Sequence, residues 1–284
     1  MKARQMVAMA ALLVSLVACS GTASPTSLAT FGPSLAPAAP TAAATAAPGG
    51  GLTIFAAASL KAALAKAKTT YEAAHTGTTL TISTDSSSAL ETQIEQGAPA
   101  DVFLSADTTN PQKLVDKGLA AGGLVKFASN LLTVIVPTDN PGYIRAPKDL
   151  ANPGVKVIAA GDTVPITKYA TMLVANLAKE TGYPADFAAK YAANIVSKED
   201  NVAAVVAKIE LGEGDAGIVY VTDAKTSTKV GTVAVPATAN VPATYSGVVV
   251  KASTNAAAAT AFLTWFAGPD CQAILAAFGF LPPN

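Results

Sequence analysis

The stretch Ile54–Leu64 reads IFAAASLKAAL and contains the junction that decides the fold. Residues 52–57 form a short apolar run typical of a buried strand, whereas residues 59–74 have the apolar spacing of a helix. Ser59 stands where the strand pattern gives way to the helix pattern. We expect Ser59 at the N-cap of this helix, where its hydroxyl either caps the helix or faces a ligand beside the free N–H groups of the first turn.

The same alternation of apolar runs and helical patterns continues to the end of the chain, which predicts α/β layers with parallel strands. In such folds ligands bind beyond the carboxyl ends of the strands. Further strands are expected at 79–83, 101–106, 131–137, 155–161, 216–222, 231–236 and 245–252. Further helices are expected at 88–96, 109–117, 168–181, 184–192, 199–211 and 255–277.

A second strand-to-helix junction lies in residues 84–106, TDSSSALETQIEQGAPADVFLSA. Ser86, Ser87 and Ser88 stand where the helix is expected to begin. Three hydroxyls beside free backbone N–H groups can form an uncharged anion-binding nest, although serine runs are also common in turns. Two junctions of this kind favour binding over catalysis.

The composition removes several classes of function. Nineteen basic and 19 acidic residues give a formal net charge of zero, so no basic surface for nucleic acid is expected. One histidine, His75, and two cysteines, Cys19 and Cys271, cannot build a zinc cluster or a disulfide framework. A serine hydrolase stays open as an alternative, but His75 at the end of the first helix is a poor base and no G-x-S-x-G motif is present. Cys271, in a helical pattern, is expected to be a buried thiol.

The N-terminus predicts export. Lys2 and Arg4 precede an apolar run that ends at Cys19, a pattern typical of a secretory signal peptide. The sequence Leu-Val-Ala-Cys at 16–19 resembles the lipobox of bacterial lipoproteins, which implies a signal peptide at 1–18 and acylation of Cys19. An ordinary signal peptide with a chance cysteine is the alternative. Residues 19–51, rich in Ala, Pro and Thr, are expected to form a disordered linker.

Four segments together resemble the molybdate-binding proteins of bacterial ABC importers. They are FAAASLKAAL (55–64), SSSALETQIEQGAPADVFLSAD (86–107), GDTVPITKYA (161–170) and GDAGIVYVTDA (214–224). The resemblance covers residues 52–284 and implies a type II periplasmic-binding fold, with two α/β lobes, a hinge and a central cleft. We expect lobe one at 52–133 plus 244–284 and lobe two at 134–243.

The resemblance also implies which residues bind the oxyanion: Ser59, Ser87, Ile166, Val202 and Tyr220. The serines and the tyrosine would use hydroxyls, and Ile166 and Val202 would use backbone N–H groups. All are uncharged donors, which suits molybdate or tungstate because these dianions accept hydrogen bonds on every oxygen and carry no proton. The residues would hold the metal through its oxygens, with no direct metal ligand, no cofactor and no catalytic residue.

Several neighbours of these positions leave the ligand shell open. Asp85 precedes the serine run and can be an exposed residue or local cap, a proton acceptor for phosphate, or a metal ligand as in tungstate-binding relatives. Glu199 and Asp200 raise the same question, although capping of the helix from about 201 is favoured. Thr167 replaces the small residue common in the family and could add a donor or crowd the cleft.

The expected function is capture of molybdate, and tungstate with it, followed by delivery to the permease and ATPase of an ABC importer. The chain would be a monomer anchored by lipid to the outer face of the plasma membrane. Sulfate, thiosulfate or phosphate stay open as alternative ligands, and a surface adhesin is a more distant alternative. Sequence does not rank molybdate against tungstate.

Overall fold

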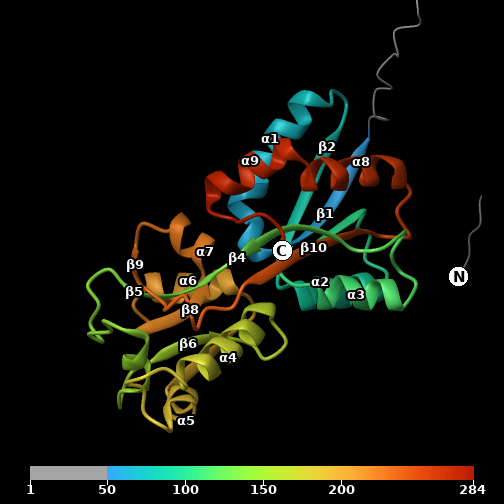
Figure 1. The fold of residues 1–284 in the computed structure, drawn as a ribbon. Coiled ribbons are helices and arrows are strands. Elements are labelled where there is room, and N and C mark those ends of the chain that lie inside the picture. The colour runs from blue at the N-terminus through green and yellow to red at the C-terminus, as the bar shows by residue number, and fades with distance from the viewer. Residues whose placement is uncertain (1–49) are drawn as a thin grey trace, which may run out of the picture. The chain divides into compact units, whose positions relative to one another are not determined.

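Two five-stranded sheets, joined by two crossings of the chain, make up residues 50–284, the part of the protein that the computed structural model describes (Figure 1). These residues fall within one compact unit. The predicted signal peptide, Cys19 and the linker up to residue 49 lie outside the described residues. The first strand begins at Gly51, inside the predicted linker. No helix in the described range is long and apolar enough to span a membrane.

The first sheet has the strand order β2-β1-β3-β10-β4. Its strands are β1 (Gly51–Ala57), β2 (Thr79–Asp85), β3 (Val102–Ser105), β4 (Val125–Asn130) and β10 (Ala243–Val249). β1 pairs in parallel with β2 and β3, whereas β10 is antiparallel to both of its neighbours. Close packing against this sheet explains Gly247 in β10, because a Cβ there would lie 2.8 Å from the carbonyl oxygen of Phe103.

Helices cover both faces of the first sheet (Figure 1). On one face lie α1 (Lys61–Ala74), α8 (Ala256–Ala267) and α9 (Pro269–Phe278); on the other lie α2 (Ser87–Glu95) and α3 (Thr109–Asp116). The core side of α1 is formed by Ala63, Leu64, Ala67 and Tyr71, which have the three- and four-residue spacing of an amphipathic helix. The resulting contacts bury all four side chains almost completely.

The second sheet repeats the plan with the order β7-β6-β8-β5-β9. Its strands are β5 (Leu132–Pro137), β6 (Val157–Ala160), β7 (Ile195–Glu199), β8 (Ala216–Tyr220) and β9 (Val230–Val233). One face packs against α4 (Pro165–Leu177), which is followed by α5 (Phe187–Ala193), and the other against α6 (Val202–Glu210) and α7 (Val221–Thr226). A 3₁₀ turn, Pro147–Ala151, links β5 to β6. We call the parts built on the two sheets the first half and the second half.

The two crossings between the halves lie side by side. Asn130, at the end of β4, pairs with Ala243, at the start of β10. Beyond that pair, the Asn240 side chain accepts a hydrogen bond from Leu132 N–H (3.0 Å) and donates one to Leu132 C=O (2.8 Å). An amide side chain thus continues the pairing of the two chain segments as they leave the first sheet.

The structure differs from the predicted elements in several places. The sheets are mixed rather than wholly parallel, because the segments that cross over, β5 and β10, each enter a sheet in the opposite direction. β4 and β7 were not predicted, since polar residues interrupt their apolar pattern. The expected helix 255–277 is two helices, separated at Gly268–Pro269 because proline starts a helix and cannot continue one.

Two of the predicted helix starts are also wrong. The helix expected from 168 begins at Pro165, which occupies its first position, so Ile166 lies in the first turn. The helix expected from 199 begins at Val202, because residues 195–199 are β7. Both corrections move the free N–H groups of a helix start toward a residue expected to bind the anion.

Candidate functional site

A small pocket, with an empty volume of about 210 Å³, is lined by residues from both halves. It is the smallest by empty volume of the pockets that the structure describes. All five predicted ligand residues lie in its wall. The lining comprises Ala57, Ala58, Ser59, Asp85, Ser86, Ser87, Ala106, Val164, Pro165, Ile166, Asn201, Val202 and Tyr220.

Ser59 is not the N-cap of the first helix, contrary to the prediction, and of the two roles left open for its hydroxyl, capping is excluded. It lies in a 3₁₀ turn, Ala58–Leu60, between β1 and α1, and neither N-cap there makes a side-chain hydrogen bond. Its hydroxyl instead lies 2.9 Å from the Tyr245 hydroxyl, whose oxygen is 3.4 Å from the Asn130 amide nitrogen. Either hydroxyl can be the donor of the bond between Ser59 and Tyr245, and when Tyr245 donates, the Ser59 proton is free to donate into the pocket.

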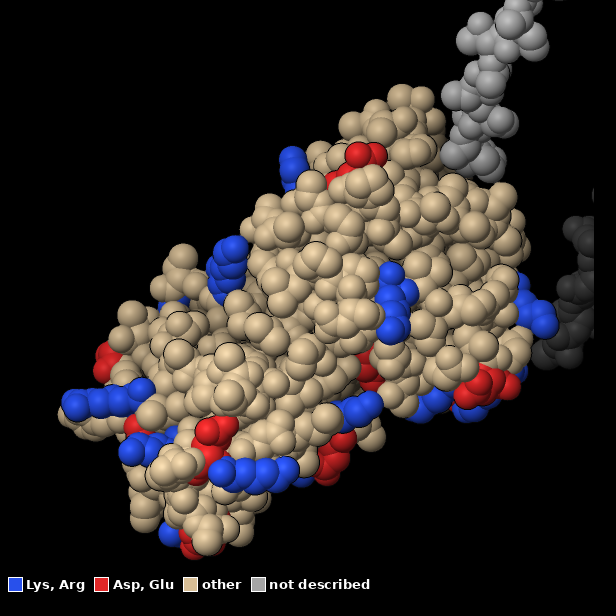
Figure 2. Space-filling model, viewed as in Figure 1, with Lys and Arg blue, Asp and Glu red and all other residues tan. Residues whose placement is uncertain are grey.

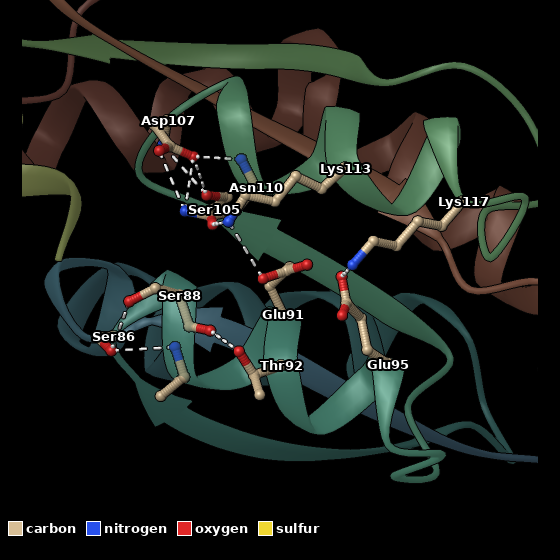
Figure 3. Close-up of polar contacts among 11 residues, drawn as sticks. Ser86, Ser88, Glu91, Thr92, Glu95, Ser105, Asp107, Asn110, Lys113 and Lys117 are labelled. Atoms are coloured by element: carbon tan, nitrogen blue, oxygen red, sulfur yellow. Dashed lines mark hydrogen bonds and ion pairs between the residues drawn. The ribbon is translucent and has the colours of Figure 1, made fainter. Parts of the chain in front are cut away.

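Ser87 lies at the first position of α2, and its neighbour Ser86 caps the helix by accepting from the N–H of Ala89 (3.3 Å). Figure 3 shows this helix start beside α3. The Ser87 oxygen accepts a hydrogen bond from Ala106 N–H (3.0 Å), and its side chain is almost completely buried. With its oxygen occupied by that donor, the hydroxyl proton of Ser87 is available to a ligand.

The turn that holds Ser87 is itself held by a polar network between β3 and α3 (Figure 3). Asp107 accepts from the Ser105 hydroxyl (2.8 Å) and from Asn110 N–H (3.0 Å). Lys113 extends the network, donating to the Asn110 side chain (3.2 Å) and to Glu91 on α2 (3.4 Å). Ala106, which binds Ser87, lies between two residues of this network and is therefore fixed in place.

Three helices begin at the pocket: α2 at Ser87, α4 at Pro165 and α6 at Val202. Each helix N-terminus has free N–H groups and about half a positive charge. Acidic residues are favoured in first turns because they offset that charge, yet none occurs in the first turn of these three helices. The one acidic side chain in the pocket wall is Asp85, which precedes Ser86 and accepts from Ser86 N–H at the start of α2 (2.7 Å).

Tyr220, at the end of β8, completes the wall. It is 1% exposed, and its hydroxyl is buried without a hydrogen-bond partner among the described residues. Burial raises the pKa of the Tyr220 hydroxyl well above its ordinary value, so the group stays a neutral donor. A buried polar atom with no partner costs about 1–3 kcal/mol. An acceptor in the pocket would remove this cost.

Two further polar side chains of the wall, Asp85 and Asn201, are hydrogen-bonded to each other across the pocket. Asn201 is the N-cap of α6, and its amide donates to the Asp85 carboxylate across the pocket (3.0 Å). Capping by Glu199 or Asp200, the favoured prediction, is therefore wrong. The signal for Asn201 was present in the sequence, because asparagine directly before an apolar helical run is a preferred N-cap.

The other residues considered from the sequence, Thr167, Glu199, Asp200 and His75, lie outside the pocket wall. Thr167 donates to the carbonyls of Ala160 (3.0 Å) and Gly161 (2.8 Å), so its hydroxyl is used within the second half. Glu199 pairs with Lys208 (3.2 Å). His75 is the C-cap of α1 and donates from Nδ1 to the carbonyl of Tyr71 (2.9 Å); it lies at the opposite end of this 14-residue helix from Ser59, about 20 Å away along the axis, and so cannot act as its base.

Cys271 is fully buried, as predicted. Burial raises the pKa of its thiol to about 12, so it stays protonated and unreactive.

A wider and mainly apolar pocket, with an empty volume of about 810 Å³, lies in the second half between α4 and α5. Of the five predicted ligand residues, its lining includes Ile166 alone. Apolar walls give a dianion too few donors. The smaller pocket at the three helix starts offers hydroxyls and free N–H groups instead.

Asp223 lies three residues beyond Tyr220, and its carboxylate accepts from Tyr220 N–H (3.3 Å). It lines, with Ser59 and Lys61, a second pocket between the halves, which has an empty volume of about 740 Å³. Burial raises the pKa of Asp223 from 3.8 to about 7. Between these two values the folded protein holds a proton that the unfolded chain has lost, so this residue makes stability fall as pH rises through the window, with no further loss above about 7.

Replacing Asp223 with Asn is expected to remove this pH dependence. Urea unfolding of the wild type and Asp223→Asn at pH 5 and pH 8 measures it. We expect the free energy of unfolding to decline between the two pH values by about 2 kcal/mol more in the wild type than in the variant. Equal declines in the two proteins would contradict the prediction.

The surface in Figure 2 carries few charged side chains, with both signs interspersed over the visible face. This matches a chain in which 13% of residues are charged. The lining of the small pocket contains no Lys or Arg, so the positive charge available there is that of the helix N-termini.

Comparison with known proteins identifies the class. Residues 52–281 match the family described as bacterial extracellular solute-binding protein. The molybdate-binding protein ModA of Mycobacterium tuberculosis is 35% identical over 275 residues, which cover 96% of this chain and 95% of that protein. An ABC transporter substrate-binding lipoprotein of Bacillus subtilis, named as putative, is 31% identical over 81% of this chain and 85% of its own length.

A solved structure shows the same fold. The periplasmic molybdate-binding protein of Azotobacter vinelandii superposes with a TM-score of 0.69 at 26% identity, covering 82% of this chain and all of that one. These matches define a two-lobed extracytoplasmic solute-binding protein and confirm the predicted periplasmic-binding fold. The chain belongs to the bacterial extracellular solute-binding protein family and, within it, to the ModA family. The matched proteins bind solutes and are not enzymes, which confirms the expectation of a binding function.

Proposed function

We propose that the protein captures molybdate, and tungstate with it, in the pocket at the three helix starts. The observation that carries the proposal is the buried hydroxyl of Tyr220, which has no partner among residues 50–284, in a wall that also presents Ser59 and Ser87. Ile166 and Val202 would add backbone N–H groups from the first turns of α4 and α6. Apart from the Asp85 carboxylate, which already accepts from Asn201 and Ser86, the polar groups of such a site can donate, and this suits a tetrahedral dianion that accepts hydrogen bonds and donates none.

The charge of the ligand fits the same wall. Three helix N-termini supply together a positive charge of roughly 1.5, which offsets most of a dianion without any basic side chain. The donors are already positioned by caps and by the network around Asp107, so little order has to be created on binding. This preorganisation supports capture at low concentration.

The family and the N-terminal pattern support the rest of the proposed role. The loaded protein would deliver its anion to the permease and ATPase of an ABC importer, and it would act as a monomer. Acylation at Cys19 would anchor it to the outer face of the plasma membrane, as the lipobox-like residues 16–19 indicate. Labelling cells with a fatty-acid analogue tests the anchor: label should enter the wild type and be absent from Cys19→Ala.

Thermal unfolding of the full chain in mild detergent, with equal concentrations of molybdate, tungstate, sulfate or phosphate, tests the ligand. A ligand at 100 times its dissociation constant adds about 2.7 kcal/mol. We therefore expect molybdate and tungstate to raise the midpoint by about 5–10 °C. Stabilisation by sulfate or phosphate alone would reassign the ligand, and the absence of any response would refute an oxyanion receptor.

A further inference from the structure

Asp85 and Asn201 come from opposite halves and meet at the pocket. Asp85 is the last residue of β2 in the first half, and Asn201 precedes α6 in the second. The Asn201 amide nitrogen donates to Asp85 Oδ1 at 3.0 Å, and both residues line the pocket. The bond can exist only when the two halves are closed on each other.

Each partner is held in place by its own half. Asp85 Oδ1 also accepts from Ser86 N–H (2.7 Å), which orients the carboxylate at the start of α2. Asn201 Oδ1 accepts from Ala204 N–H (3.1 Å), which fixes the amide as the cap of α6. Forming the bond across the cleft therefore costs little side-chain entropy, because both groups are already oriented.

The position of the bond links closure to the ligand. Asp85 precedes the serine run that contains Ser87, and Asn201 precedes Val202. Closing the bond therefore brings the donors of the two halves to the distance at which both can reach one ion. Three other side-chain hydrogen bonds join the halves in the described residues: Asn130, beside the crossings, to Thr222 (2.8 Å), Lys168 to Thr109 (3.2 Å) and Lys225 to Ala277 O (3.5 Å).

We infer that Asp85 and Asn201 are positioning residues that form a latch across the cleft and hold the loaded, closed protein. The inference rests on the proposed function. The latch does not use the anion as a partner: the Asp85 carboxylate is an acceptor, as the anion is, and is directed to an amide donor instead. Its effect is to slow release of the ligand, because reopening must break a charge-assisted hydrogen bond.

Asparagine suits the latch because its side chain carries both an acceptor and a donor. Serine and aspartate also cap helices well, but neither can donate across the pocket in this way: serine is too short, and ionised aspartate has no proton. Asn201→Ser therefore keeps the cap of α6 and removes the latch. Asn201→Asp keeps the cap and places a second carboxylate against Asp85.

The exchange Asp85→Asn with Asn201→Asp reverses the latch. The new amide at position 85 can accept from Ser86 N–H and donate across the pocket, while the new carboxylate at position 201 can cap α6 and accept. This double variant should recover the molybdate affinity that the single variants at Asn201 lose. A residue important for packing alone would not be rescued by such an exchange.

The test measures molybdate affinity by calorimetry and its dissociation rate by stopped flow, in the full chain. Asn201→Ser should bind about tenfold more weakly, mainly through faster dissociation, with an unchanged unfolding midpoint in the absence of ligand. Asn201→Asp should lose more, and the double exchange should return to within about threefold of the wild type. Thr109→Ala, which removes an exposed bond between the halves, is the matched control and should change affinity by less than about twofold.

Each outcome decides between the latch and its alternatives. Wild-type affinity in Asn201→Ser, or failure of the double exchange to recover binding lost in Asn201→Asp, would overturn the latch while leaving molybdate capture intact. A loss of affinity in Thr109→Ala as large as that in Asn201→Ser would overturn the latch as well, because any contact between the halves would then stabilise the closed protein equally. A wild type that binds none of the four anions would overturn the proposed function and the latch together.

Discussion

Tyr220→Phe is expected to weaken molybdate binding by about 10- to 100-fold while raising the stability of the ligand-free protein by about 1–3 kcal/mol. The two effects have opposite signs because they have one cause. The Tyr220 hydroxyl is buried without a partner in the described residues, so removing it relieves a desolvation cost. In the loaded protein the same hydroxyl would donate to the dianion, and hydrogen bonds to charged groups contribute about 1.5–3 kcal/mol.

Calorimetric titration with molybdate measures the expected loss of affinity, and urea unfolding without ligand measures the expected gain in stability. Tyr191→Phe is a matched control, because Tyr191 is also a buried tyrosine, 8% exposed, but lies on α5 away from the small pocket. It should leave affinity within about twofold of the wild type. Unchanged binding in Tyr220→Phe would show that its hydroxyl does not face the anion, and a loss of stability would mean that it has a partner in the folded protein.

Val202→Pro is expected to lower molybdate affinity by about 10- to 100-fold by deleting one backbone N–H. Val202 is the first residue of α6, where proline is favoured because the N–H has no partner within the helix. Asn201 before it is extended, with φ −156° and ψ 170°, which is the conformation that a following proline requires. The substitution therefore removes a donor from the pocket and leaves the helix start in place.

Val202→Ala is the control that distinguishes loss of the backbone N–H from loss of the side chain, because it shortens the side chain and keeps the N–H. We expect its affinity to stay within about threefold of the wild type. Urea unfolding should place Val202→Pro within about 1 kcal/mol of Val202→Ala. Equal affinities in the two variants would rule out the N–H of Val202 as a ligand of the anion.

The sequence predicts the parts of this site that are local. The junctions at Ser59 and Ser87 are visible because an apolar run ends and a helical pattern begins within a few residues. The N-cap role of Asn201 was not predicted although its signal is local, because the charged residues Glu199 and Asp200 before it suggest an earlier helix start. Pro165 likewise marks the true start of α4.

The parts that escape prediction depend on residues far apart in the chain. Ser59 meets Tyr245, which is 186 residues away, and the contact displaces the expected capping role of its hydroxyl. The unpartnered state of Tyr220 is a property of the packed structure and has no pattern in the sequence. The antiparallel direction of β5 and β10 follows from the crossings between the sheets. The apolar pattern of a single strand carries no information about such crossings.

The paired crossings make the second half an insertion into a β-hairpin of the first. β4 and β10 are antiparallel neighbours, and the chain between Asn130 and Ala243 departs and returns at one ladder position. The amide of Asn240 then ties the returning strand to Leu132 at the next step. Two strands bound to each other in this way bend together far more easily than they twist or slide. Hinge motion that keeps these bonds would therefore bend both segments as one connection.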